Sequence, residues 1–504
     1  MRTNILEYLE ATAPRLPHKV ALSDGREEMT FGELSSASRS LGSALLARSY
    51  QSEPIAVLMQ KSPREVAAFL GCIHAGCFYV PLDPEMPPRR MEMILESVGA
   101  RAMILDEKSE RIAKELSFAG ERLSYTELTS GVEDPVALAR VRERQIDTDP
   151  IYIVFTSGST GVPKGVVACH RSVIDYTEAL CEALPFSEET VFGNQTPLYF
   201  DAPLKELMPT LKYGATVYFI PKMLFSFPTR LCDFLNEHRV NTVCWVVSAL
   251  SMISSLGVLE SNPPRYLHTV AFGSEVFPPL QYRLWRKALP TAKFFNLYGP
   301  TEATGMSCYW AAERDLEEGE AIPVGRPFRN TDLFLLTEDG RRAAEGEVGE
   351  ICLRGTCVTL GYFNNPEKTA EAFVQNPLQK GYPELIYRTG DLGRFNRHGE
   401  LVFVSRKDAQ IKHRGHRIEL GEIEAAAANS ERIERVCACY DKERERLVLF
   451  FVGAIEEKEL LTFLRGYLPR YMLPTHLVHL SAMPLTPNGK MDRKLLATRA
   501  LEMD

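Results

Sequence analysis

From the N-terminus to about residue 400, short apolar runs alternate with amphipathic stretches of helical period. Residues 55–59 and 78–82 are apolar runs of strand length, and the segment 64–74 between them has the spacing of an amphipathic helix. The runs 216–220 and 242–246 continue the pattern. Strands that alternate with helices form largely parallel sheets that helices cover. This part of the chain is therefore predicted to be an α/β domain of layered parallel sheets and helices.

Strand and turn signals become denser between about residues 325 and 404, which predicts a β-rich subdomain. The clearest boundary lies at residues 406–408, between two strand-like runs. Beyond it, a glutamate-rich helix start, two further strands and a helical tail indicate a small α+β domain. We expect a large domain over residues 1–407 and a small, mobile C-terminal domain over residues 408–504.

Composition excludes several classes of protein. Of the 504 residues, 45% are hydrophobic and 25% are charged, as in ordinary globular proteins, and the formal net charge is -8. A negative balance argues against a nucleic-acid partner or a polybasic membrane anchor. No apolar run reaches the roughly 18 residues that a membrane span needs, and the N-terminus lacks a secretory signal pattern. We expect a cytoplasmic protein without a membrane span.

The eleven cysteines are scattered through apolar stretches. Cys437 and Cys439 fall on one face of a strand, and neither they nor the pair around His74 have the spacing of a zinc site. Buried free thiols are therefore expected.

The run 155–165, FTSGSTGVPKG, follows an apolar stretch over residues 151–154. Its three glycines let backbone N–H groups approach a ligand closely, its four hydroxyl residues add short donors, and Lys164 adds a positive charge. The run lacks the spacing of a Walker loop. It predicts a loop that holds a polyphosphate which must later leave, in preference to a surface linker.

Five further motifs follow in order: 296–302 (NLYGPTE), 387–391 (YRTGD), 406–412 (RKDAQIK), 415–419 (GHRIE) and 487–494 (PNGKMDRK). Together with the glycine-rich run they resemble the motifs of the adenylate-forming (ANL) superfamily, over essentially the whole chain. This superfamily includes acyl-CoA synthetases, luciferase and the adenylation domains of nonribosomal peptide synthetases. The resemblance implies that a carboxylate attacks the α-phosphate of ATP, which gives an acyl-adenylate and pyrophosphate, and that a thiol then displaces AMP.

The resemblance implies a role for each motif. Lys490 would bridge the substrate carboxylate and the phosphate, Lys164 would hold the β- and γ-phosphates, and Glu302 would ligate Mg²⁺. Tyr298 would stack on adenine, and Asp391 would accept the ribose hydroxyls. The implied nucleotide-binding residues are Thr156, Ser157, Gly158, Ser159, Thr160, Gly161, Gly273, Ser274, Glu275, Asn296, Tyr298, Gly299, Thr301, Asp391 and Arg406.

Asp408 lies at the domain boundary and, by the same resemblance, is the hinge about which the small domain rotates between the half-reactions. Rotation would withdraw Lys490 and bring the loop 415–417 to the active site, beside a channel for phosphopantetheine. An ordinary surface aspartate in a turn is the alternative.

Asp201 is similar to the aspartate that amino-acid-activating members place against the substrate α-amino group. The carried-over side-chain pocket consists of Ala202, Lys205, Trp245, Val270, Phe272, Leu297, Gly305 and Met306. Its bulky members favour a small side chain such as that of alanine or serine, as does a likeness of 272–276 to D-alanine–carrier protein ligases. Lys205 favours an acidic substrate if it points inward, but a lysine can also extend out of a pocket.

No carrier motif follows residue 494, so the thiol acceptor is expected to be the phosphopantetheine arm of a separate carrier protein. Two alternatives stay open. One is an acyl- or aryl-CoA ligase that acts on an acid without an amino group. The other is a nucleotide-binding scaffold without catalysis, which the presence of Lys164, Glu302, Asp391 and Lys490 opposes.

Overall fold

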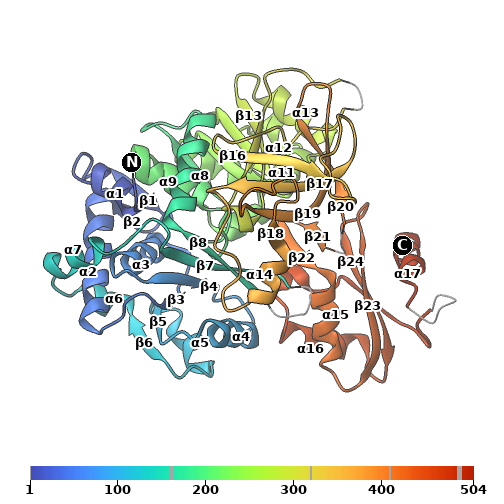
Figure 1. Ribbon diagram of the computed structural model, residues 1–504, viewed down its shortest axis with the longest axis horizontal. Coiled ribbons are helices and arrows are strands. Elements are labelled where there is room, and N and C mark those ends of the chain that lie inside the picture. The colour runs from blue at the N-terminus through green and yellow to red at the C-terminus, as the bar shows by residue number, and fades with distance from the viewer. Residues whose placement is uncertain (1, 159–162, 318–319, 408–409, 485–490, 504) are drawn as a thin grey trace.

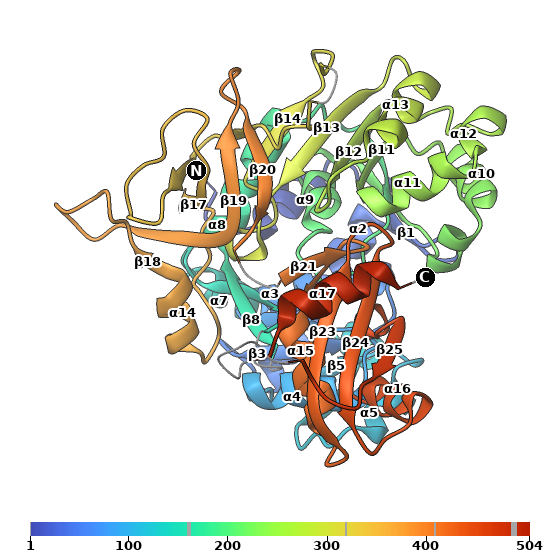
Figure 2. The ribbon, with the colours of Figure 1, turned by 90° about the vertical axis from the view of Figure 1, so that its right-hand side faces the viewer.

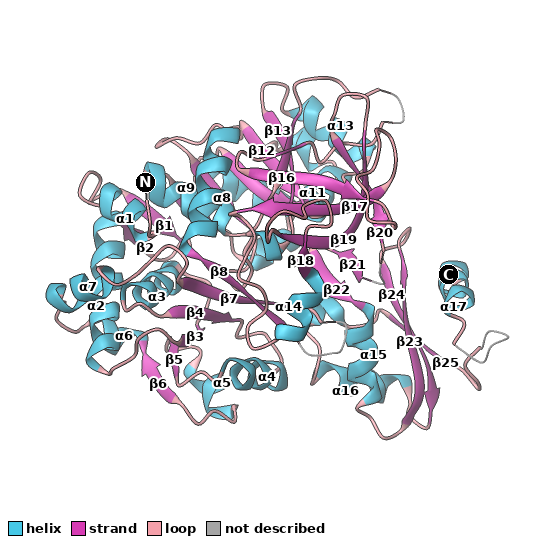
Figure 3. Ribbon diagram, viewed as in Figure 1, coloured by secondary structure: helices cyan, strands magenta, loops and turns pink. Residues whose placement is uncertain are grey.

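A computed structural model describes residues 2–158, 163–317, 320–407, 410–484 and 491–503 (Figure 1). The structure contains two large sheets, a smaller antiparallel sheet and a C-terminal α+β unit, and the second large sheet includes the two N-terminal strands, 20–23 and 28–30. Figure 3 shows helices against the sheets of the N-terminal half and strands prevailing in the segment that follows. The predicted fold class is confirmed.

The first large sheet contains the strand that precedes the glycine-rich run. Neighbouring strands of this sheet are parallel, except for the last pair, β7 (Pro150–Thr156) and β8 (Lys164–Cys169), which is antiparallel. The two central strands, β3 (Pro54–Leu58) and β4 (Phe78–Leu82), are buried along their whole length, which explains their uninterrupted apolar sequences. In spatial order the strands are β6 (Glu121–Ser124), β5 (Ala102–Leu105), β3 (Pro54–Leu58), β4 (Phe78–Leu82), β7 (Pro150–Thr156) and β8 (Lys164–Cys169).

The second large sheet is parallel in its centre and antiparallel at both ends. In spatial order its strands are β15 (Arg326–Pro327), β14 (Cys308–Ala311), β13 (Lys293–Tyr298), β12 (Thr269–Gly273), β11 (Thr242–Val246), β9 (Val191–Asn194), β10 (Thr216–Phe219), β1 (Val20–Ser23) and β2 (Glu28–Thr30). The carboxyl ends of β12 and β13 carry two of the predicted nucleotide motifs.

Helices α8 (His170–Ala183) and α9 (Leu204–Tyr213) share one hydrophobic cluster with residues of both sheets. Seven of the ten residues of α9 are buried, as expected of a helix packed between layers. The other helices of the large domain are α1 (Leu6–Thr12), α2 (Phe31–Ala47), α3 (Pro63–His74), α4 (Pro88–Val98), α5 (Glu110–Glu115), α6 (Tyr125–Thr129), α7 (Pro135–Arg142), α10 (Pro228–Glu237), α11 (Val247–Ser255), α12 (Val258–Ser261), α13 (Pro279–Ala288) and the 3₁₀ turns η1 (Lys222–Ser226) and η2 (Thr301–Ala303).

The β-rich segment is an antiparallel sheet with one helix, as the turn signals indicated. It consists of β16 (Thr331–Leu336), β17 (Gly349–Gly355), α14 (Pro366–Ala372), β18 (Phe373–Gln375), β19 (Leu385–Phe395) and β20 (Leu401–Arg406).

The C-terminal unit lies at one side of the molecule, with α17 on its outer face (Figures 1 and 2). It consists of β21 (Gln410–His413), β22 (His416–Glu419), α15 (Leu420–Ala428), β23 (Ile433–Asp441), β24 (Arg446–Gly453), α16 (Glu457–Arg465), η3 (Arg470–Met472), β25 (His476–His479) and α17 (Arg493–Glu502). The predicted hinge, Asp408, lies outside the described residues.

All eleven cysteines are buried and free of disulfides. Within the described ranges there is no cluster of three or more potential metal ligands from histidine, cysteine, aspartate and glutamate. Over the same ranges, the chain contains no helix that is long and apolar enough to cross a membrane.

Candidate active site

The glycine-rich run joins two antiparallel strands. β7 ends at Thr156 and β8 begins at Lys164, so these two residues are register partners at the base of the loop. The Thr156 hydroxyl is buried and has no hydrogen-bond partner among the described residues. A buried hydroxyl without a partner suits a ligand oxygen that is absent from the structure. Ser159, Thr160 and Gly161, three further predicted phosphate ligands, lie outside the described residues.

Glu302 is fully buried beside this loop, in η2. The Tyr362 hydroxyl donates a hydrogen bond to its Oε1 atom at 2.8 Å, and the Arg417 guanidinium contacts both carboxylate oxygens, at 3.1 and 2.9 Å. Burial raises the pKa of Glu302, but the charges of Arg417 and Lys164 outweigh it and leave the pKa below its usual value. Glu302 is therefore a carboxylate, the form that a hard cation requires.

Lys164 lies over the Tyr362 ring, with its ammonium 5.3 Å from the ring centre. Burial lowers the pKa of Lys164, and the Arg417 charge lowers it further. Two cations are thus held beside one carboxylate, an arrangement that suits an anionic ligand such as a phosphate. No individual role was predicted for Arg417 or Tyr362 from the sequence. Arg417 did belong to a quoted motif, whereas no sequence signal pointed to Tyr362.

Asp391 and Tyr298 lie together at the edge where the second large sheet meets the β-rich sheet. The Tyr298 hydroxyl donates to Oδ2 of Asp391 at 2.5 Å, and Arg406 forms an ion pair with Oδ1. The Lys412 ammonium, from the C-terminal unit, lies 5.6 Å from the centre of the Tyr298 ring. Burial lowers the pKa of Lys412, while the Asp391 charge acts in the opposite direction. The structure thus brings together Asp391, predicted to bind the ribose, and Tyr298, predicted to stack on adenine, and it places the Lys412 ammonium beside the Tyr298 ring.

The ends of β12 and β13 approach each other closely. A Cβ atom at Gly273 would lie 2.3 Å from the carbonyl oxygen of Leu297, and one at Gly299 would lie 2.4 Å from Cα of Met306, so no side chain fits at either glycine. Ser274, which follows β12, has a φ of 69°, in the left-handed region. Asn296, also predicted to bind nucleotide, donates to the Pro323 carbonyl at 2.8 Å.

The Asp201 carboxylate is buried just before α9. Its Oδ2 atom accepts a hydrogen bond from the Gly305 amide at 3.1 Å. Burial raises the pKa of Asp201, and both a hydrogen bond from the Thr301 hydroxyl and the Lys205 charge limit the increase. The site therefore holds a carboxylate that gains from a cationic partner.

The structure does not bring all eight expected side-chain residues together. Trp245 and Phe272 are register partners on β11 and β12, and with Val270 they pack in one hydrophobic cluster. Leu297 and Met306 pack in another, together with the α8–α9 layer. Leu297 pairs in register with Gly273, the residue after Phe272. Because consecutive residues of a strand face opposite ways, Leu297 and Phe272 lie on opposite faces of the sheet. The Trp245 indole donates to the Gly193 carbonyl at 2.7 Å.

On the face that carries Leu297, Gly305 packs against the ring of Tyr176, whose buried hydroxyl has no hydrogen-bond partner within the described ranges. Ala202 is half-buried and lies just before the start of α9. Tyr176 was not found from sequence because no motif surrounds it.

Lys205 is only 4% exposed, so it does not extend to solvent. Its ammonium forms no hydrogen bond to the described residues, although it interacts electrostatically with Asp201 and Glu206. Glu206 accepts a hydrogen bond from the Asn194 amide at 3.2 Å and has one buried oxygen without a partner in the described ranges. Lys61 approaches from the other large sheet and donates to the Asn194 and Gln195 carbonyls at 3.3 and 3.2 Å.

This buried cluster predicts a dependence of stability on pH. Burial raises the pKa of Glu206 to about 7, against the charges of Lys205 and Lys61. The folded protein therefore keeps a proton that the unfolded chain releases from about pH 4.5 upward, and the free energy of unfolding falls as the pH rises from about 4.5 to 7. For Glu206→Gln we expect the difference in free energy of unfolding, variant minus wild type, to increase by about 3 kcal/mol from pH 4 to pH 8. Urea unfolding at the two pH values measures this difference. Glu457→Gln, an exposed control on α16, is expected to show no such change; equal curves for both variants would contradict the prediction.

The loop 415–417 lies in the site. The Gly415 amide donates to Glu275 at 2.6 Å, and Glu275 also accepts from the Ser248 amide at 2.8 Å. The His416 ring stacks on Tyr471, with ring centres 3.9 Å apart. Lys490, the predicted catalytic lysine, lies outside the described residues.

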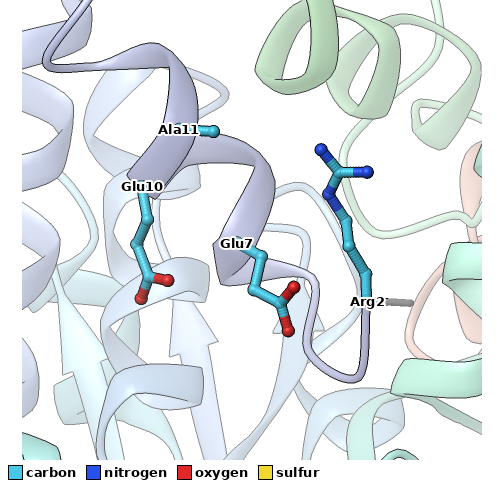
Figure 4. A pocket seen from close by; sticks show the side chains of 4 residues that line it. All are labelled: Arg2, Glu7, Glu10 and Ala11. Carbon is cyan, nitrogen blue, oxygen red and sulfur yellow. The ribbon is translucent and has the colours of Figure 1, made fainter.

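A surface pocket of about 500 Å³ lies elsewhere, at the N-terminus (Figure 4). It is lined by Arg2, Glu7, Glu10 and Ala11, none of which is a predicted site residue. Glu7 is paired with Arg142 at 3.3 Å.

Comparison with known proteins decides the family. The sequence model described as "AMP-binding enzyme" matches residues 9–363 of the chain. The chain belongs to the AMP-binding enzyme family. The prediction of an ATP-dependent adenylate-forming ligase is thereby confirmed at the level of enzyme class.

Two curated relatives match this AMP-binding enzyme over nearly its whole length. Zwittermicin A synthase ZmaJ of Bacillus cereus is 32% identical over 510 residues, which cover 99% of this chain and 95% of that protein. Tyrocidine synthase 1 of Brevibacillus parabrevis is 30% identical over 504 residues, which cover 98% of this chain and 45% of that protein. The chain thus spans less than half of the second relative.

Solved structures share the fold. The adenylation domain AlmE of Vibrio cholerae, in complex with glycyl-adenosine-5'-phosphate, has a TM-score of 0.86 at 21% identity and covers 100% of this chain and 98% of its own. PA1221, which contains adenylation and PCP domains, has a TM-score of 0.82 at 24% identity, with 100% and 85% covered. The o-succinylbenzoate CoA synthetase MenE of Bacillus subtilis has a TM-score of 0.84 at 21% identity, with 99% of each chain covered.

Proposed function

We propose that this AMP-binding enzyme activates an α-amino acid as its adenylate and passes it to the phosphopantetheine thiol of a separate carrier protein. Asp201 carries the amino-acid part of the proposal. Its buried carboxylate has an amide donor on one side and forms no ion pair with the described residues, although the Lys205 charge acts on it, so it gains from the cation that the α-ammonium group of an amino acid supplies.

The first half-reaction needs positive charge around a triphosphate and an in-line approach of the substrate carboxylate. Thr156, Ser157, Gly158 and Lys164 would hold the β- and γ-phosphates, and Asp391 with Tyr298 would hold the nucleoside. Magnesium would be held by Glu302, whose ionised carboxylate fits a hard cation, and it would offset the phosphate charge. Lys490 would stabilise the charge that develops between carboxylate and phosphate.

In the second half-reaction, a thiol must approach the adenylate and displace AMP. The loop 415–417 lies in the site, where it would line the approach of the phosphopantetheine arm. The adenylation–PCP architecture of PA1221 makes a carrier protein the favoured acceptor. The large domain over residues 1–407, the small domain over 408–504 and the hinge at Asp408 form part of this proposal, as does a cytoplasmic location.

The side chain of the amino acid stays open between two classes. A small one, such as that of alanine or serine, agrees with the bulk of Leu297 and Met306. Lys205 favours a side chain that ends in a carboxylate, because its buried ammonium makes no hydrogen bond to the described residues. Trp245 and Phe272 add little to the first argument, since they pack on the other face of their strands.

ATP–pyrophosphate exchange with a panel of D- and L-amino acids, fatty acids and aryl acids tests the proposal. We expect one amino acid to give the dominant signal, and alanine, serine, aspartate and glutamate to separate the two side-chain classes. The alternative is an acyl- or aryl-CoA ligase, the class of the fold relative MenE. Exchange only with acids that lack an α-amino group, followed by transfer to free CoA, would favour that alternative and overturn the role of Asp201.

A further inference from the structure

Two lysines and two carboxylates meet where α9 packs between the two large sheets. Asp201 precedes this helix, Lys205 and Glu206 lie in its first turn, and all three side chains are buried. Lys61, which follows β3 of the first large sheet, acts on the Glu206 carboxylate together with Lys205. At about pH 7.5 both Glu206 and Lys61 are mainly charged, because burial raises the pKa of Glu206 to about 7 and lowers that of Lys61 to about 8. The four groups thus carry two positive and two negative charges.

A further carboxyl group beside Lys61 leaves this balance unchanged. Glu65 also acts on the Lys61 ammonium. Burial raises the pKa of Glu65 well above its usual value, and the Asp83 charge raises it further. Glu65 therefore favours its neutral form, and the charge of Lys61 offsets that of Glu206.

Lys205 is the member of this cluster whose charge meets no polar partner. It is only 4% exposed, and its ammonium makes no hydrogen bond or ion pair with the part of the chain that the structure describes. Lys61 differs, because it donates to the Asn194 and Gln195 carbonyls at 3.3 and 3.2 Å. An unpaired buried cation destabilises a site until a ligand supplies an acceptor. Lys205 therefore suits an acceptor group of the substrate.

Other atoms of the cluster also suit a polar substrate side chain. Three buried oxygens have no hydrogen-bond partner within the described ranges, namely the Tyr176 hydroxyl, Oε1 of Glu206 and Oδ1 of Asn194. The Tyr176 hydroxyl belongs to the cluster, since the charges of Asp201 and Glu206 act on it. This hydroxyl can donate a hydrogen bond to a ligand oxygen, which the methyl group of alanine does not provide.

The α-ammonium group of an amino acid at Asp201 changes the charge balance. Three cations then face two carboxylates, and the α-ammonium group pairs with the carboxylate whose charge otherwise acts on Lys205. A neutral side chain leaves one buried positive charge in excess. A side-chain carboxylate restores neutrality and gives Lys205 its acceptor.

We propose that Lys205 binds a carboxylate on the side chain of the substrate, so that the enzyme selects an acidic amino acid, and that Lys61 keeps Lys205 available by offsetting Glu206. The inference rests on the proposed function, which places the α-ammonium group at Asp201. Of the two side-chain classes left open there, it selects the acidic one.

Pairs of an acid and its amide test the inference on the wild type. Aspartate and asparagine, like glutamate and glutamine, have nearly the same shape and differ by one charge. In ATP–pyrophosphate exchange with D- and L-amino acids at about pH 7.5, we expect one acid to exceed its amide about a hundredfold in kcat/KM, as for a buried charge pair. A ratio below about tenfold, or a neutral or basic amino acid as the best substrate, would overturn the inference alone. Absence of exchange with every amino acid would overturn the proposed function and the inference with it.

Lys205→Met tests the residue itself. The substitution keeps the length of the side chain and removes the ammonium, so we expect the acid-to-amide ratio to fall about a hundredfold, mainly through a higher KM for the acid. Lys212→Met, on the same helix, is the matched control, because Lys212 pairs with Glu178 at 2.7 Å, outside the cluster. It is expected to keep the wild-type ratio. A ratio that Lys205→Met leaves unchanged would overturn the inference.

The role of Lys61 is a positioning one, and a rescue experiment tests it. Without Lys61, Glu206 competes with the substrate for Lys205, so Lys61→Met is expected to lower the acid-to-amide ratio about tenfold. The double variant Lys61→Met/Glu206→Gln removes the competing charge and is expected to restore the ratio, which a purely structural role of Lys61 would not allow. Equal ratios in the single and double variants would overturn the role of Lys61.

Discussion

Lys490→Ala is expected to reduce ATP–pyrophosphate exchange about a hundredfold or more. The proposed first half-reaction brings a carboxylate toward a triphosphate, and this lysine would offset the charge that develops between them. Removal of a single group that stabilises transition-state charge costs about 10²- to 10³-fold in rate. The loss is expected in kcat more than in KM for ATP, since the loop and Asp391 would still hold the nucleotide.

Two controls sharpen this prediction. Lys494→Ala removes an exposed lysine four residues away on α17 and is expected to leave exchange unchanged. Transfer from a chemically prepared aminoacyl-adenylate to a carrier thiol is expected to stay within a few-fold of wild type in Lys490→Ala, because the loop 415–417 would serve that step. Unchanged exchange in Lys490→Ala, with an unchanged melting temperature, would remove the assigned role.

Asp201→Asn is expected to reduce kcat/KM for the amino acid about a hundredfold. The substitution keeps the shape of the side chain and its hydrogen bond from Gly305 but removes the charge that would face the α-ammonium group. Breaking one side of a buried, hydrogen-bonded charge pair costs about 2–5 kcal/mol. The measurement is pyrophosphate exchange with the best amino acid of the panel, compared with the same acid without its amino group.

The desamino acid should lose little or nothing on Asp201→Asn, because it has no ammonium group to pair with the aspartate. Asp233→Asn, on the exposed face of α10, controls for the chemical change and is expected to behave as wild type. Because burial raises the pKa of Asp201, activation by the wild type should also weaken on acidification sooner than an exposed aspartate would allow. An unaltered rate in Asp201→Asn would remove the main argument for an amino acid over other carboxylic acids.

Local sequence information was sufficient for the architecture. The apolar runs 55–59 and 78–82 formed buried parallel strands, and the segment 64–74 formed α3, because periodicity follows from which faces of an element meet the core. The turn signals after residue 325 formed the antiparallel sheet β16–β20. The phosphate loop and the two motifs that contain Tyr298 and Asp391 also lay within reach of sequence, since each motif is short, but the hydrogen bond between these two residues joins positions 93 apart.

Only the tertiary structure decided which side chains meet across long stretches of chain. Arg417 contacts Glu302 across 115 residues, and Glu422 contacts Gly158 across 264 residues, so no local pattern could reveal either contact. The side-chain pocket shows the same limit. Alignment with a family pattern assigned Trp245 and Phe272 to the pocket, but strand register placed them in a different cluster from Leu297. Sequence determines which elements form, because their periodicity is local, whereas the packing of distant elements determines which faces and charges share one site.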